Sequence, residues 1–252
     1  MSSEVPEFTI LYHFPKKMKG RGEFLRLMLE DAGITNYGNT DENLYGPDGM
    51  MDAFRGSIEG IDADTTDFPL LFPPAILHRP SGGSEPLVLV NQVGACMIYL
   101  GDVLGYAPKT NAEKARANCI MLNCLDYLAD GRVSFHPVKN TASYHDQEEE
   151  GNRVSKEFTK DRMLKYLHHF NKVIKKTGGP EKPIAGGEAV TYADFVLFHV
   201  LDATKSQFNS EFYEHAWDKT VEKLPLLKEY HEWIANRPNL KTYFESERCT
   251  RK

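Results

Sequence analysis

The sequence predicts two parts, an α/β domain at residues 6–106 and an all-helical domain at residues 109–248. About the first hundred residues alternate strand-like apolar runs with helical patterns, and the remaining residues show helical patterns alone. Gly105 and Pro108 interrupt the pattern between them, where the composition shifts. We therefore expect a mixed sheet domain followed by a bundle of helices.

The first predicted elements are a buried strand, a basic connection and a helix. Phe8–Tyr12 has the apolar, β-favouring residues of a strand, and Pro15 ends it. Lysines and glycine at 16–20 make the connection cationic and bendable, and the apolar helix at 24–33 ends at a glycine suited to a left-handed cap. A tyrosine and a histidine delivered to the positive end of a helix indicate an anion or thiolate site.

The rest of the first part predicts a helix at 50–58, a Pro73-Pro74 pair and a β-hairpin over residues 75–90. Asn91 is the expected N-cap of the helix that follows. This order of strands and helices resembles a thioredoxin-like α/β unit.

The second part predicts a series of helices joined by polar or Pro/Gly-rich loops. The expected helices cover residues 111–128, 157–176, 190–203, 211–223, 225–236 and 239–246, with an irregular polar segment at 136–151. Thr191-Tyr192-Ala193-Asp194 predicts a capping box, in which the threonine hydroxyl and the aspartate carboxylate exchange hydrogen bonds with backbone N–H groups. This motif has a structural role.

Composition and charge exclude several functional classes. The formal charge of −6 argues against a general nucleic-acid binder, which needs surplus lysine and arginine. The N-terminus lacks the pattern of a secretory signal, and no apolar run is long enough to span a bilayer. The four cysteines and the His168-His169 pair lack metal-ligand spacing, so we expect no metal and a reduced, cytoplasmic chain.

Five segments in this order resemble the cytosolic glutathione transferases. They are LYHFP…GRGEFLRLMLEDAG, PPAIL, LVNQVGACMIYLGDVLG, VTYADFVLFHVLD and LPLLKEYHEWIANRPNLKTYFES, and they cover roughly residues 8 to 248. The resemblance is to the tyrosine-type enzymes, with the long strand-to-helix loop of fungal and protist forms. It implies a glutathione-binding thioredoxin-like domain, a helical C-terminal domain, a homodimer and a role in detoxification.

The resemblance also implies a group that stabilises the glutathione thiolate, and two neighbours compete for this role. Counting from the strand start selects Tyr12, whereas counting back from Phe14-Pro15 selects His13. We favour Tyr12 because its hydroxyl donates a hydrogen bond without a change of protonation. Residues 12–22 contain no cysteine or serine, which disfavours the family's cysteine- and serine-dependent variants.

The remaining expected glutathione contacts follow from the same resemblance. Gln92 matches the first residue of the family's Gln-Ser pair, but Val93 lacks the hydroxyl of the second. Either Pro74 or Pro73 is the cis proline. If it is Pro74, the preceding Pro73 has no N–H to offer glutathione; if it is Pro73, Phe72 keeps both backbone groups.

Arg55 is a candidate for binding the glycyl carboxylate of glutathione. The resemblance thus implies an enzyme that joins the glutathione thiolate to small, largely apolar electrophiles. It implies glutathione as the co-substrate, and we expect no metal, nucleic acid or membrane to take part. The alternative is a non-catalytic protein of the same fold that binds ligands or serves in an assembly.

Overall fold

The computed structural model describes residues 6–12, 19–39, 70–81, 86–140 and 142–249. The chain divides into one unit of Met1–Ala107 with Arg237–Lys252, and a second unit of Pro108–Asn236. The helix predicted at residues 50–58 lies outside the described residues.

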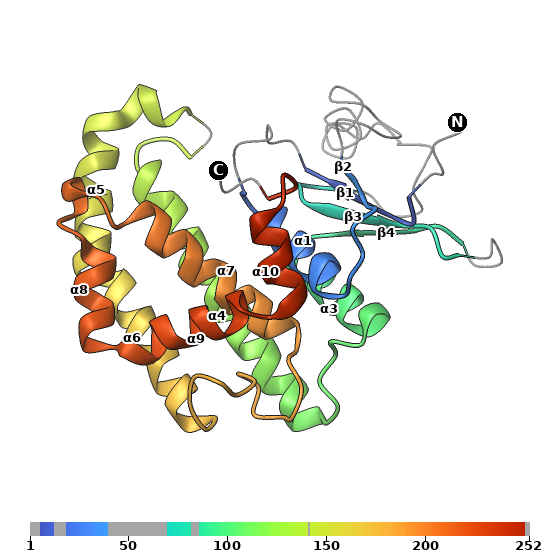
Figure 1. Cartoon of the computed structure of the whole chain (residues 1–252). Helices are drawn as coiled ribbons and strands as arrows, with labels where there is room; N and C mark the ends of the chain where they lie inside the picture. The colour runs from blue at the N-terminus through green and yellow to red at the C-terminus, as the bar shows by residue number, and fades with distance from the viewer. Residues whose placement is uncertain (1–5, 13–18, 40–69, 82–85, 141, 250–252) are drawn as a thin grey trace. The chain divides into compact units, whose positions relative to one another are not determined.

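A four-stranded sheet with helices against it forms the first unit (Figure 1). Its elements are β1 (Phe8–Leu11), α1 (Glu23–Asp31), β2 (Gly38–Asn39), β3 (Ala75–His78), β4 (Val88–Asn91), α3 (Val93–Leu104) and, from the end of the chain, α10 (Pro238–Glu245). The strand order is β2-β1-β3-β4, with β1 parallel to β2 and antiparallel to β3, and β3 antiparallel to β4. The predicted hairpin at 75–90 and the thioredoxin-like arrangement are confirmed.

Strand pairing brings three of the predicted site residues to the same end of the sheet. Leu11 of β1 is opposite Ala75 of β3, and Ala75 is also opposite Asn91 of β4. The residues just beyond this row therefore emerge at one end of the sheet. They are Tyr12, Pro74 and Gln92.

Helix α1 is buried along its whole length because α10 and α3 both pack against it. Its last two acidic residues are neutralised from the C-terminal segment: Arg248 bonds Glu30 at 2.9 and 3.0 Å, and Arg237 bonds Asp31 at 2.8 and 2.6 Å. These ion pairs are the physical reason why residues 237–252 belong to the first unit, although the predicted division assigned 109–248 to the helical domain.

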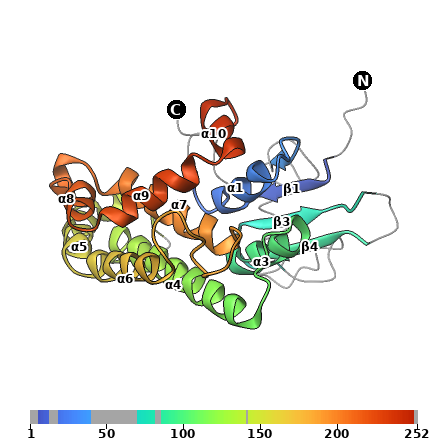
Figure 2. The ribbon, with the colours of Figure 1, turned by 60° about the horizontal axis from the view of Figure 1, so that its bottom comes forward.

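Helices make up the described part of the second unit (Figure 2). They are α4 (Asn111–Phe135), η1 (Tyr144–Gln147), α5 (Glu148–Lys160), α6 (Arg162–Lys176), α7 (Tyr192–Gln207), η2 (Glu211–Tyr213), α8 (Ala216–Lys223) and α9 (Pro225–Ala235). Helix α7 is the centre of this unit, since every residue from Tyr192 to Asp202 is buried and the helix packs on α4 and α9. The all-helical prediction is confirmed.

Some predicted boundaries in the second unit were wrong. The helix expected at 157–176 is two helices that are separated at Asp161 and begin at Glu148, within the segment expected to be irregular. Three consecutive glutamates lie in the first turn of α5, where the positive end of the helix dipole stabilises negative charge. This polar segment therefore starts a helix, although its polarity suggested an irregular loop. The helix expected at 111–128 continues to Phe135.

The capping box predicted at the start of α7 is deeply buried. The Asp194 carboxylate accepts hydrogen bonds from the N–H of Thr191 at 2.7 Å and from its hydroxyl at 2.9 Å. It also accepts the N–H of Ile184 and the hydroxyl of Tyr230, each at 2.7 Å. Burial raises the pKa of this carboxyl, and the four hydrogen bonds act in the opposite direction.

Candidate thiolate site at the end of the sheet

Tyr12 places its hydroxyl in the glycine-rich turn that precedes α1. The residue follows β1 directly and is 8% exposed, and its hydroxyl oxygen accepts the backbone N–H of Arg21 at 2.8 Å. A hydroxyl that accepts one hydrogen bond becomes a stronger donor of its own proton. This arrangement can stabilise an anion such as a thiolate close to the start of a helix.

The turn contains glycine at the two positions that face the tyrosine ring. A Cβ atom added at Gly20 would lie 2.3 Å from the Tyr12 hydroxyl oxygen, and Gly20 also has a left-handed φ of +45°. A Cβ atom at Gly22 would lie 3.0 Å from a carbon of the same ring. The Gly20-Arg21-Gly22 spacing is therefore a signal in the sequence for this site.

A buried ion pair supports the turn from the side of α1. The guanidinium of Arg26 donates to Glu23 at 2.9 Å and to the carbonyl of Lys19, also at 2.9 Å. Tyr243 of α10 donates its hydroxyl to both Glu23 oxygens at 3.1 Å. Burial alone would lower the pKa of Arg26, but Glu23 raises it overall, so the guanidinium remains charged.

The turn before β3 forms the second part of the site. The peptide bond between Pro73 and Pro74 is cis, so Pro74 is the cis proline and Pro73 the residue that precedes it. The Asn91 side chain holds this turn, donating to the carbonyls of Phe72 and Pro74 and accepting the N–H of Leu71 at 3.2 Å. Phe72 itself is 58% exposed.

The expectation that Asn91 caps the next helix was wrong. Gln92 is the N-cap of α3, with φ 75° and ψ 129°, and Asn91 is still part of β4. The Asn91 side chain is already used by the turn across the sheet, a contact that sequence spacing does not show. A non-glycine residue with positive φ is uncommon, and such residues cluster at ligand sites.

The structure brings several of the predicted site residues together. Tyr12, Pro74 and Gln92 emerge at the same end of the sheet, and Gln92 is exposed there. Val93 is 3% exposed, so its side chain belongs to the core. His13 and Arg55 lie outside the described residues.

The described residues contain neither a metal-ligand cluster nor a helix that could span a membrane. No group of three or more His, Cys, Asp or Glu side chains there could hold a metal ion. Among the described helices, none combines the length and apolar character needed to cross a bilayer.

Comparison with known proteins finds similarity to glutathione S-transferases. Residues 134–247 match the family model described as Glutathione S-transferase, C-terminal domain. A relative from Plasmodium falciparum, named Glutathione S-transferase, is 28% identical over 94 residues, which are 36% of this chain and 40% of the relative. The chain thus spans about two fifths of that relative's length.

Solved structures resemble the chain over nearly its whole length. The crystal structure of the glutathione S-transferase from Ascaris lumbricoides has a TM-score of 0.60 at 21% identity, covering 95% of this chain and 97% of its own. The Pi-class glutathione S-transferase of Onchocerca volvulus has a TM-score of 0.63 at 19% identity, with 95% and 92% covered. The fold is that of the glutathione S-transferases. The family-model match and the Plasmodium relative show that part of this similarity extends to the sequence.

Proposed function

We propose that this chain is a glutathione transferase that joins the glutathione thiolate to small, largely apolar electrophiles. The observation that carries the proposal is the Tyr12 hydroxyl, which accepts the N–H of Arg21 beside α1 and lies at the same sheet end as Pro74 and Gln92. We further propose a cytoplasmic homodimer with a role in detoxification, as the family resemblance implies.

In this mechanism Tyr12 donates a hydrogen bond to the glutathione sulfur. The thiol proton leaves to solvent, because the hydrogen bond and the positive end of α1 favour the thiolate over the thiol. The thiolate then attacks an electrophilic carbon, a carbon–sulfur bond forms, and the leaving group departs with its electron pair. The protein stabilises the glutathione thiolate and orients it.

Glutathione would lie along the sheet end. Gln92 and the first N–H groups of α3 would hold the γ-glutamyl carboxylate, since Val93 has no hydroxyl and its side chain is buried. Phe72, Pro73 and Pro74 would face the cysteinyl backbone. Pro73 has a carbonyl but no N–H, so it offers one hydrogen bond where other residues would offer two.

Two residues outside the described part of the chain complete the proposal. Arg55 would bind the glycyl carboxylate of glutathione, and His13 is the alternative partner of the sulfur.

The first experiment is a conjugation assay with glutathione and 1-chloro-2,4-dinitrobenzene, paired with thermal unfolding in the presence of glutathione. We expect turnover and a raised unfolding temperature, because a ligand that binds the folded state stabilises it. No turnover together with no thermal shift would refute the proposal. A shift without turnover would favour the second candidate, a non-catalytic binding protein, which the buried Val93 and the missing Pro73 N–H support.

The second experiment is the substitution Tyr12→Phe. We expect kcat/KM to fall about 100-fold, equivalent to a rise of about two units in the pKa of bound glutathione, because the sulfur loses its donor. The pKa is read from the ultraviolet absorbance of the thiolate as pH increases.

The matched control for Tyr12→Phe is Tyr106→Phe. Its hydroxyl bonds Asp31 at 2.6 Å, at the opposite end of α1, so its loss should leave the pKa of bound glutathione unchanged. If Tyr12→Phe keeps full activity while His13→Ala loses it, His13 is the partner of the sulfur.

A further inference from the structure

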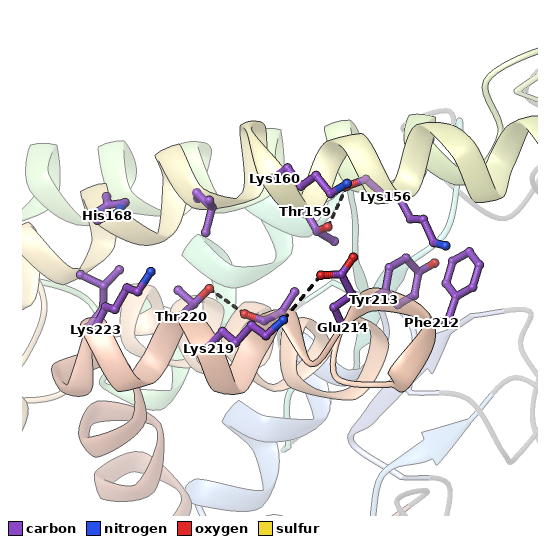
Figure 3. A pocket seen from close by; sticks show the side chains of 13 residues that line it. Lys156, Thr159, Lys160, His168, Phe212, Tyr213, Glu214, Lys219, Thr220 and Lys223 are labelled. Carbon is purple, nitrogen blue, oxygen red and sulfur yellow. Dashed lines mark hydrogen bonds and ion pairs between the residues drawn. The ribbon is translucent and has the colours of Figure 1, made fainter.

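A basic cavity of about 300 Å³ lies within the second unit. Helices α5 and α6 form one wall, and η2 and α8 form the other (Figure 3). This volume is at the lower end of the range for small-molecule sites. None of its lining residues belongs to the sheet unit, so the cavity is separate from the candidate thiolate site.

Four lysines face this cavity, two from each wall. Lys156 and Lys160 come from α5, and Lys219 and Lys223 come from α8. Glu214 is the one acidic residue of the lining, and it pairs with Lys219 at 3.5 Å. After this pair cancels, the charges of three lysines remain, in a chain whose net charge is −6. Such a local excess of positive charge attracts anions.

The lining also carries an apolar surface. Leu164 of α6 and Leu224, just after α8, contribute aliphatic side chains, and Phe212 and Tyr213 of η2 contribute aromatic rings. Phe212 is 38% exposed, so part of its ring is accessible. The ammonium group of Lys156 lies 4.0 Å from the centre of the Phe212 ring, a cation–π contact. The lysines can contact an anionic group, and the aromatic and aliphatic side chains can contact a flat apolar one.

The link between η2 and α8 has an uncommon backbone. Glu214 and His215 are consecutive non-glycine residues with left-handed φ values of 53° and 52°. The His215 ring contacts the carbonyl of Asn209 at 2.9 Å, which helps to hold this conformation. Left-handed non-glycine residues cost free energy and concentrate at ligand sites. The wall that carries Glu214 and Lys219 is therefore built at a cost to stability.

A lysine lies at each end of the cavity. His168 and Lys223 lie at one end, Lys156 and Phe212 lie at the other, and Lys160 lies between them (Figure 3). We propose that this cavity binds a small organic dianion, with a flat apolar body and an acidic group towards each end. The aromatic and aliphatic lining would hold the body, and the lysines at the two ends would each meet one acidic group.

The test compares two probes that share one body, biphenyl-4,4′-dicarboxylate and biphenyl-4-carboxylate. Isothermal titration calorimetry on the full chain should show the diacid binding about two- to fivefold more tightly, because it gains a second exposed charge contact. The preference should shrink as salt is added. Equal affinities, or no binding of either probe, would overturn the proposal.

Paired substitutions locate the binding. Lys156→Gln with Lys223→Gln should weaken binding of the diacid by about fivefold and binding of the monoacid less, since the charge contact at each end of the cavity is lost. The control is Lys172→Gln with Lys175→Gln, which removes the same charge from exposed positions of α6 outside the cavity. If the control lowers the affinity for the diacid equally, the binding is a general effect of surface charge and the proposal fails. These measurements do not involve glutathione, so they are independent of the proposed transferase activity.

Discussion

The starts of α1 and α7 show two different uses of a helix N-terminus. Helix α7 begins at a threonine whose N–H and hydroxyl are bonded by the buried carboxylate of Asp194. Helix α1 begins after Gly22, which has no side chain to cap it, and the neighbouring N–H of Arg21 meets the Tyr12 hydroxyl instead. The first start is closed by the protein's own acid, whereas the second presents a hydroxyl suited to an outside anion.

The buried carboxylates at the starts of the two helices also have different roles. Asp194 accepts all four of its hydrogen bonds from within the second unit and joins α7 to α9 through Tyr230. Glu23 binds Arg26 and Tyr243 and supports the turn that holds Tyr12. A buried acid at a helix start can therefore stabilise the fold directly or can position a neighbouring group. Three substitutions test this contrast.

The largest expected effect is from Asp194→Ala. We expect the free energy of unfolding to fall by about 3 to 4 kcal/mol, because the cap is lost and the buried Tyr230 hydroxyl loses its acceptor. The control is Glu113→Ala in the exposed capping box of α4, where Glu113 accepts the N–H of Thr110 at 3.2 Å. That change should cost about 0.5 to 1 kcal/mol. Equal losses in urea denaturation would contradict the view that burial makes the α7 cap important.

An intermediate effect is expected from Gly20→Ala. The substitution places a Cβ atom 2.3 Å from the Tyr12 hydroxyl oxygen and strains a left-handed residue. We expect a loss of about 2 to 3 kcal/mol in stability and at least about tenfold in kcat/KM for glutathione conjugation, because the hydroxyl is displaced.

The matched control for Gly20→Ala is Gly105→Ala. Gly105 has a similar φ of +81° but no atom within 4 Å of an added Cβ. It should lose about 1 kcal/mol of stability and keep its activity. If both variants lose activity equally, contact with Tyr12 is not the cause.

The smallest expected effect is from Tyr243→Phe. The hydroxyl bonds both oxygens of Glu23, so its removal should cost about 1 to 2 kcal/mol in the free energy of unfolding. Tyr166→Phe is the control, since that hydroxyl bonds Asp130, whose side chain is 36% exposed. There we expect a loss below about 0.5 kcal/mol. A Tyr243→Phe variant as stable as the control would show that Glu23 does not depend on α10.

Much of the fold could be predicted because its signals are local. Apolar residue type on either side of a Pro/Gly turn predicted the hairpin of β3 and β4, and the thioredoxin-like order followed from the sequence of elements. The break at Asp161 was missed because the apolar pattern on either side of it suits one continuous helix. For the candidate site, Tyr12, Pro74 and Gln92 were chosen from the family resemblance. Their presence at one sheet end depends on strand register.

The two-part architecture and the cap of α7 follow from local sequence; for the cap, Thr191 and Asp194 are only three residues apart. Contacts between distant residues depend on the tertiary structure. It showed that Asn91 holds the turn at Leu71–Pro74, and that Tyr243 reaches Glu23 across 220 positions of the chain. A cap depends on neighbouring dihedral angles, whereas these contacts exist only after the sheet register and helix packing have brought remote backbone and side-chain groups together.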